Sequence, residues 1–190
     1  MAKRKRIKIN RPRMTGGKPP YTLASFAPVA LLSTSQVAAI QSSDLAAMTT
    51  AQINALSTTQ ILALTDPQVS ALTTSQIKGL TTAAVAALTT AQITAMDTVD
   101  VAALNTQAVQ ALSAAALHAL STSQLNALGS DQIKALTTAQ LAAVKTDQLA
   151  ALSTAQVGAL TSAQTAALSL KQVAALETAD VAALATSVTA

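Results

Sequence analysis

One eight-residue pattern, Ser/Thr-Thr-x-Gln-Ile/Val/Leu-x-Ala-Leu, repeats nineteen times between residues 33 and 184 without insertion or deletion. Regular copies are Thr49–Leu56 and Thr89–Met96. Chains with a strict short period fold as one-dimensional stacks in which each unit contacts its neighbours. Such a stack leaves few positions for a unique catalytic site. The repeat therefore says more about architecture than about chemistry.

The eight-residue period excludes one continuous helix. At about 100° per residue, eight residues advance a helix by about 800°, so the apolar stripe would slip by about 80° in every octad. A long coiled coil needs a period near 3.5 or 3.67 residues, which an octad does not supply. We therefore expect the helix to break once per octad.

The first four positions of the octad indicate where the break falls. Position 1 is Ser, Thr, Asp or Asn in 15 octads, and position 4 is Gln in 13 octads. Ser or Thr followed three residues later by Gln is the capping box that begins a helix. Pro67, at position 3, agrees with this assignment because proline is tolerated in a first helical turn. We predict one short helix over positions 2 to 8 of each octad.

The remaining positions predict a thin apolar core. Position 5 is Val, Ile or Leu in every octad except at Thr165, position 8 is Leu in 15 octads, and position 7 is Ala except at Gly79. Helices this short do not persist alone in water, so they must stack on one another. The sequence predicts an all-α repeat solenoid of very short helices, with Ala where neighbouring backbones approach closely. A β-solenoid is the alternative, because Thr, Ile and Val also favour strands, but abundant Ala and Gln favour helices.

Charge divides the chain into an arm and a body. The first 18 residues carry eight cationic side chains and no acid, whereas the rest carries four Lys and eight Asp or Glu. We divide the chain into a basic extended arm (1–20), an aromatic junction with a degenerate first repeat (21–32), the nineteen octads (33–184) and an incomplete octad (185–190). Residues 23–32 resemble a signal peptide in hydropathy, but Pro28 and the octad register of Val29 and Leu32 favour a degenerate repeat.

The octads resemble the Leu-Thr-Thr-x-Gln-Ile-x-Ala arrays of large proteobacterial surface or secreted proteins, which are often described as adhesin-like. The resemblance covers residues 33–184 and implies a structural or adhesive role without catalytic residues. The short chain and its basic arm depart from that pattern. They make a small assembly component, such as a phage virion protein, as reasonable as a protein of the bacterial surface.

The arm and the junction are the main candidate sites. The arm would bind phosphates or an acidic protein surface with salt-dependent affinity, and a protein partner is favoured over nucleic acid because the arm has no interleaved aromatics for base stacking. The two aromatic residues of the chain cap the first repeat or anchor a partner. The predicted partner-binding residues are Lys3, Arg4, Lys5, Arg6, Lys8, Arg11, Arg13, Lys18, Tyr21 and Phe26.

Other polar residues have simpler interpretations. His118 has no second His and no Cys to complete a metal site, so we expect a solvent-facing side chain. Asp97, Asp100, Asp131 and Asp147 occupy cap and first-turn positions, where the helix dipole favours acids. No catalytic residue, cofactor or metal is predicted. A regular Thr face could also bind ice or another surface, as a minor alternative.

The last octads suggest self-association. Nothing in the sequence caps the final repeat with charge, so we expect Val181 and Leu184 to be half covered and, with Val188, to contact a second copy. The sequence thus predicts a non-enzymatic rod or fibre, anchored through its arm in a virion or a bacterial surface appendage. A nucleic-acid-binding arm carried on a repeat spacer is the alternative.

Overall fold

The computed structural model describes residues 29–188, and the side chains of residues 29–184. Within that range the chain forms a short 3-10 helix, η2 (Val29–Leu31), and then one α-helix in each octad. The α-helices are α1 (Thr34–Ala38), α2 (Ser42–Ala47), α3 (Thr50–Asn54), α4 (Thr58–Leu62), α5 (Asp66–Ser70), α6 (Thr74–Lys78), α7 (Thr82–Ala87), α8 (Thr90–Thr94), α9 (Thr98–Ala103), α10 (Thr106–Ala111), α11 (Ala114–Ala119), α12 (Thr122–Asn126), α13 (Ser130–Ala135), α14 (Thr138–Ala142), α15 (Thr146–Ala150), α16 (Thr154–Gly158), α17 (Ser162–Ala166), α18 (Leu170–Ala174) and α19 (Thr178–Val188).

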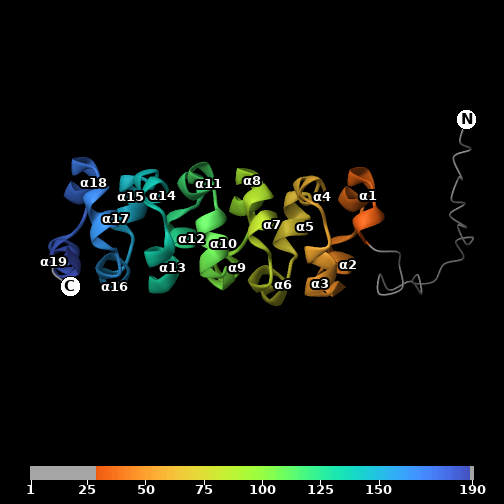
Figure 1. Cartoon of the computed structure of the whole chain (residues 1–190), viewed down its shortest axis with the longest axis horizontal. Coiled ribbons are helices and arrows are strands. Elements are labelled where there is room, and N and C mark those ends of the chain that lie inside the picture. The colour runs from red at the N-terminus through yellow and green to blue at the C-terminus, as the bar shows by residue number, and fades with distance from the viewer. Residues whose placement is uncertain (1–28, 189–190) are drawn as a thin grey trace, which may run out of the picture.

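The helices follow one another along a single axis, and the described body is elongated (Figure 1). α1, α4, α8 and α11 lie in one row, and α3, α6, α13 and α16 lie in the opposite row (Figure 1). No β-strand occurs in the described residues. The all-α solenoid of very short helices is thereby confirmed, and the β-solenoid is not the fold.

Each helix begins where the capping box predicts. At α14 the N-cap Thr137 is extended, with φ −73° and ψ 158°. Its hydroxyl accepts from the amide of Gln140 at 3.1 Å, and the Gln140 Oε1 accepts from the amide of Thr137 at 2.7 Å. The same reciprocal pair opens α1, α3, α4, α6, α8, α12, α16, α17 and α18.

Helices α1 to α18 end earlier than position 8, which corrects the predicted length, whereas α19 continues through position 8 to Val188. α14 covers positions 2 to 6 of its octad, and α10 covers positions 2 to 7 before Leu112 turns extended at ψ 137°. The reason is local: the next N-cap needs an extended backbone, so the chain must leave the helix by position 8. No described residue has a positive φ. This turn needs no left-handed residue, which explains why Gly is rare in the repeat.

Positions 5 and 8 form the core, as the sequence predicts. Every position-5 side chain from Val37 to Val157 is at most 2 % exposed. Most position-8 side chains are buried beside them, for example Leu120 and Leu128 at 1 %. The large aliphatic side chains therefore line the inside of the whole array, at roughly 1.5–3 kcal/mol for each one buried.

One superhelical turn takes between three and four octads. Each helix packs against the third helix after it, as α3 does on α6 and α11 on α14. Long-range side-chain hydrogen bonds join residues that are 25 to 31 positions apart in the sequence. This spacing is longer than three octads, which have 24 residues, and shorter than four octads, which have 32. The residues before the first full octad join this pattern, because Gln60 Nε2 donates to the carbonyls of Val29 and Leu32 at 3.0 and 2.7 Å.

Candidate functional site

A ladder of glutamine side chains joins neighbouring turns of the solenoid, with gaps where position 4 is Ala84, Asp100, Ala108 and Ala116. Gln140 Nε2 donates to the carbonyl of Leu112 at 2.7 Å and to that of Val109 at 2.9 Å, which are 28 and 31 residues earlier. We call the set of position-4 glutamines that make the 28-residue bond the glutamine ladder. Its members are Gln60, Gln68, Gln76, Gln92, Gln124, Gln132, Gln140, Gln148, Gln156, Gln164 and Gln172.

Both ends of each ladder amide are occupied. Oε1 accepts from the amide of the helix N-cap, and Nε2 donates to the turn below, as Gln92 does toward Thr89 and Leu64. All eleven side chains are buried, with exposures of 8 % or less. A buried amide with every polar atom paired stabilises the fold, whereas an unpaired one is costly. The ladder therefore specifies the register between turns.

The ladder was not predicted from the sequence, although a signal for it exists. A capping box accepts Glu as readily as Gln at this position. Position 4 nevertheless contains 13 Gln and no Glu. The preference follows from the donor: an ionised carboxylate would place negative charge against the carbonyl oxygens that Nε2 now reaches.

Asp100 interrupts the ladder with a buried acid. It occupies position 4 of α9 and is 4 % exposed. Its Oδ1 accepts from the Thr74 hydroxyl at 3.1 Å, and its amide donates to the Asp97 carboxylate at 2.9 Å. Burial, together with the nearby Asp97 charge, raises the pKa of Asp100 above 3.8, and the Thr74 hydrogen bond opposes this shift. The predicted first-turn position is correct, but the sequence did not indicate the burial.

Positions 6 and 7 make a second contact between turns. Asn54 Nδ2 donates to the carbonyl of Gly79 at 2.7 Å, and His118 Nδ1 lies 3.0 Å from the carbonyl of Ala143. Because a carbonyl only accepts, His118 must carry its proton on Nδ1. His118 is exposed, as expected, but it bonds to the next turn rather than to solvent alone. A Cβ on Gly79 would overlap the Thr50 methyl, which shows how closely position 7 approaches the turn below.

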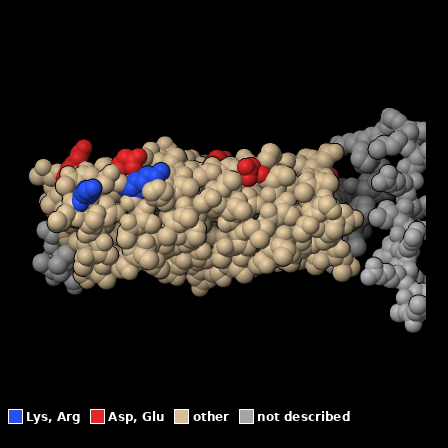
Figure 2. Space-filling view, turned by 90° about the horizontal axis from the view of Figure 1, so that it is seen from above, with Lys and Arg blue, Asp and Glu red and all other residues tan. Residues whose placement is uncertain are grey.

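The outer surface carries little charge. Figure 2 shows Lys, Asp and Glu side chains in a band along one edge of the body, with the rest of that face uncharged. Exposed positions 2 and 3 of the octads are mostly Thr, Ser and Ala, such as Thr90, Ala91 and Thr138. Successive octads are rotated by about a third of a turn or slightly less, so position-2 hydroxyls from consecutive octads point in different directions.

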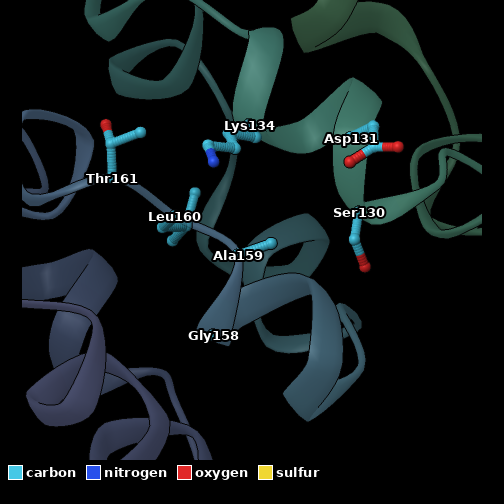
Figure 3. Close-up of a pocket in the computed structure, with 7 residues that line it drawn as sticks. All are labelled: Ser130, Asp131, Lys134, Gly158, Ala159, Leu160 and Thr161. Atoms are coloured by element: carbon cyan, nitrogen blue, oxygen red, sulfur yellow. The ribbon is translucent and has the colours of Figure 1, made fainter. Parts of the chain in front are cut away.

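A hollow of about 500 Å³ lies between α13 and the segment that joins α16 to α17. Figure 3 shows its lining: Ser130, Asp131, Lys134, Gly158, Ala159, Leu160 and Thr161. Gly158 contributes no side chain there, which opens the space. The groups that line it are one ammonium, one carboxylate, two hydroxyls, the apolar side chains of Ala159 and Leu160, and backbone. No second acid or imidazole stands beside Ser130 or Thr161 among these lining residues to activate a hydroxyl.

The predicted arm and junction residues, Lys3 to Lys18 with Tyr21 and Phe26, lie outside the described residues. Of the predicted self-association residues, Val181 is 42 % exposed, whereas Leu184 is only 5 % exposed and so is buried rather than half covered. Val188 belongs to α19, but its side chain lies outside the description. Within residues 29–188, no group of three or more His, Asp or Glu side chains is placed to hold a metal. No helix there is long and apolar enough to cross a membrane.

Comparison with protein families identifies the repeat. The model of the ALTTAQ repeat matches residues 37–74, 70–98, 93–130, 101–138 and 134–170, which together cover more than half of the chain. The chain belongs to the ALTTAQ repeat family. The six letters of that name correspond to positions 7, 8, 1, 2, 3 and 4, so an ALTTAQ unit runs from the close-packed Ala to the ladder Gln. No curated protein and no solved structure matches the chain.

Proposed function

We propose that this ALTTAQ repeat chain is a non-enzymatic structural protein that forms a self-associating rod, anchored through its basic N-terminal arm in a larger assembly. A phage virion or a bacterial surface appendage of the adhesin-like kind would be such an assembly. One observation carries the proposal: the same type of turn-to-turn hydrogen bond recurs in eleven of the fifteen octads from Gln60 to Gln172. Octads can therefore be added without a new type of interface, so the repeat serves to set length.

The surface chemistry supports this role. The repeat buries most of its large aliphatic side chains and the ladder glutamines, and it presents mainly small hydroxyl and methyl groups outside. A surface with little charge and few large side chains gives a smooth, weakly interacting shaft. Specific attachment then falls to the arm, which concentrates eight cations in 18 residues.

The test is a length series with and without the arm. Chains with three or six central octads removed, in steps of whole octads, should shorten in electron micrographs in proportion to the octads lost. Removal of residues 2–18 should leave the shaft unchanged and abolish attachment to the assembly. A compact monomer in light scattering, with no dependence of shape on octad number, would refute the rod.

A nucleic-acid-binding arm on a repeat spacer is the second candidate, and the arm's charge favours it. This alternative predicts that affinity for duplex DNA falls steeply with salt. It also predicts that the affinity is lost when residues 2–18 are removed. Assembly of the intact chain in the absence of nucleic acid would favour the structural role.

A further inference from the structure

Three octads in the middle of the body lack the ladder glutamine because their position 4 is alanine: Ala84, Ala108 and Ala116. All three alanines are buried, with exposures of 6 % or less. In a ladder octad the Gln side chain satisfies two backbone groups, one in its own N-cap and one in the turn before. A methyl group can do neither. The backbone groups at these three positions therefore need another partner.

At Ala84 the ladder register identifies the two groups as the N–H of Thr81 and the C=O of Leu56, which lies 28 residues earlier, as Leu64 does from Gln92. The N-cap itself is intact, because the Thr81 hydroxyl accepts from the amide of Ala84 at 3.2 Å. Neither the Thr81 N–H nor the Leu56 C=O bonds to a described residue. One donor and one acceptor thus remain on either side of the alanine.

Ala116 repeats this arrangement. The Ser113 hydroxyl accepts from the amide of Ala116 at 3.0 Å, so the helix is capped in the usual way. The N–H of Ser113 and the C=O of Leu88, the two groups that a Gln at this position would join, have no partner among the described residues. The unpaired groups therefore follow from the missing amide and not from a disturbed helix.

Ala108 differs in one respect. Its N-cap is Asn105, whose Oδ1 accepts from the amide of Ala108 at 2.8 Å and whose Nδ2 donates to the carbonyl of Lys78 at 3.3 Å. The Asn side chain thus supplies one bond to the turn before. The N–H of Asn105 and the C=O of Leu80 still have no described partner.

The chemistry of these groups restricts what can pair with them. A partner must accept from an N–H and donate to a C=O, so neither a simple anion nor a metal cation satisfies both. It must also be small, because α7 packs on α4, and α10 on α7, more extensively than the ladder helix α6 packs on α3. A Gln amide uses two atoms for the two bonds, whereas a water molecule makes both through one oxygen.

We propose that each of the three alanine octads binds one buried water molecule. The water accepts from the N-cap N–H and donates to the position-8 carbonyl of the turn before, as a Gln amide does elsewhere. Its second proton can reach the position-5 carbonyl, which is Ile53, Ile77 or Val85 and corresponds to the second acceptor of a ladder amide. This gives the three hydrogen bonds that are typical of a buried water. The waters thereby carry the turn-to-turn bonding through octads that have no glutamine.

Water–amide Overhauser measurements on the full-length wild type test the three sites directly. A water held longer than the tumbling time of the protein gives cross peaks of opposite sign in the laboratory and rotating frames. We expect such peaks at the amides of Thr81, Asn105 and Ser113. The matched internal controls are the N-cap amides of Thr89 and Thr137, which donate to ladder Oε1 atoms at 2.8 and 2.7 Å and should show none. Peaks absent from all three amides, or equally strong at the controls, would overturn the proposal.

Three substitutions install the amide that the water replaces: Ala84→Gln, Ala108→Gln and Ala116→Gln. Each should remove its own cross peak and lower by one the number of long-lived waters counted by oxygen-17 relaxation dispersion. The control is Ala83→Gln with Ala115→Gln, which makes the same change at exposed position 3 and should leave peaks and count unchanged. An unchanged count in the triple variant would refute the sites. Circular dichroism checks the fold, and if a variant does not fold, the wild-type comparison decides alone.

Discussion

The side-chain amide of Gln140 is hydrogen-bonded at both ends, to the N-cap amide of Thr137 at 2.7 Å and to the carbonyl of Leu112 at 2.7 Å. The first bond begins a helix, and the second holds that helix on the turn below. One residue type therefore links local structure to superhelical packing. This link explains how helices of five or six residues, far too short to persist alone, remain ordered.

The first prediction tests the donor half of this amide. Gln140→Glu keeps an acceptor for Thr137 but places a carboxylate against the carbonyls of Val109 and Leu112. We expect it to destabilise the fold by about 2–3 kcal/mol, because a buried donor is lost and a charge is desolvated. Urea unfolding at a concentration where the chain is monomeric measures this. Gln36→Glu is the control, and equal losses in both variants would contradict the ladder.

The second prediction concerns Asp100, the buried acid in the ladder. Asp100→Gln should stabilise the chain at neutral pH by about 1–2 kcal/mol. The new side-chain amide is expected to donate to the carbonyls of Val69 and Leu72, which lie 31 and 28 residues earlier as in the ladder. Asp44→Gln, at the same octad position but exposed, should change stability little.

The pH dependence of this effect follows from the raised pKa of Asp100. The folded state holds the proton more tightly than the unfolded state, so the stability that the acid contributes is fully present below 3.8 and is lost as pH rises through the folded pKa. The advantage of Asp100→Gln should therefore grow from acid to neutral pH. Thermal melts of both chains across that range would show it, and a constant advantage would contradict the assignment.

Much of this fold follows from the octad by local physics. Ser or Thr at position 1 and Gln at position 4 specify where each helix begins, and the apolar residues at positions 5 and 8 specify its buried face. The number of octads per turn could not be derived, because it depends on how the glutamine amides meet backbone carbonyls 28 residues away. The absence of Glu at position 4 is the one sequence feature that reflects this requirement.

The ends of the array show the same limit on sequence reasoning. Val181 and Leu184 occupy positions 5 and 8 of the same octad, so the pattern predicted equal exposure. Leu184 is 5 % exposed in α19, which packs on α16, whereas Val181 in the same helix is 42 % exposed. The exposure of these two side chains depends on which helices pack against each of them, and the octad pattern does not record that.

The third prediction uses two glycines with different surroundings. Gly79→Ala brings a methyl onto the Thr50 Cγ2 atom, while Gly158→Ala meets nothing nearer than the Ala183 Cβ at 3.6 Å. We expect Gly79→Ala to destabilise the chain by about 1 kcal/mol or more through overpacking, and Gly158→Ala to stabilise it by about 0.5–1 kcal/mol as a better helix former. Adding Thr50→Ser should rescue Gly79→Ala, and failure of that rescue in denaturant melts would place the strain elsewhere.

The last prediction compares two neighbouring threonines, Thr137, which caps a helix, and Thr138, which does not. The hydroxyl of Thr137 accepts the amide of Gln140 at 3.1 Å, whereas the exposed Thr138 side chain has no hydrogen bond to a described residue. Thr137→Ala should therefore cost about 1 kcal/mol, the usual loss for an N-cap, and Thr138→Ala should be neutral or slightly stabilising because Ala favours helix. Hydrogen exchange of the α14 amides would localise the loss, and equal protection in the two variants would argue against a capping role at position 1.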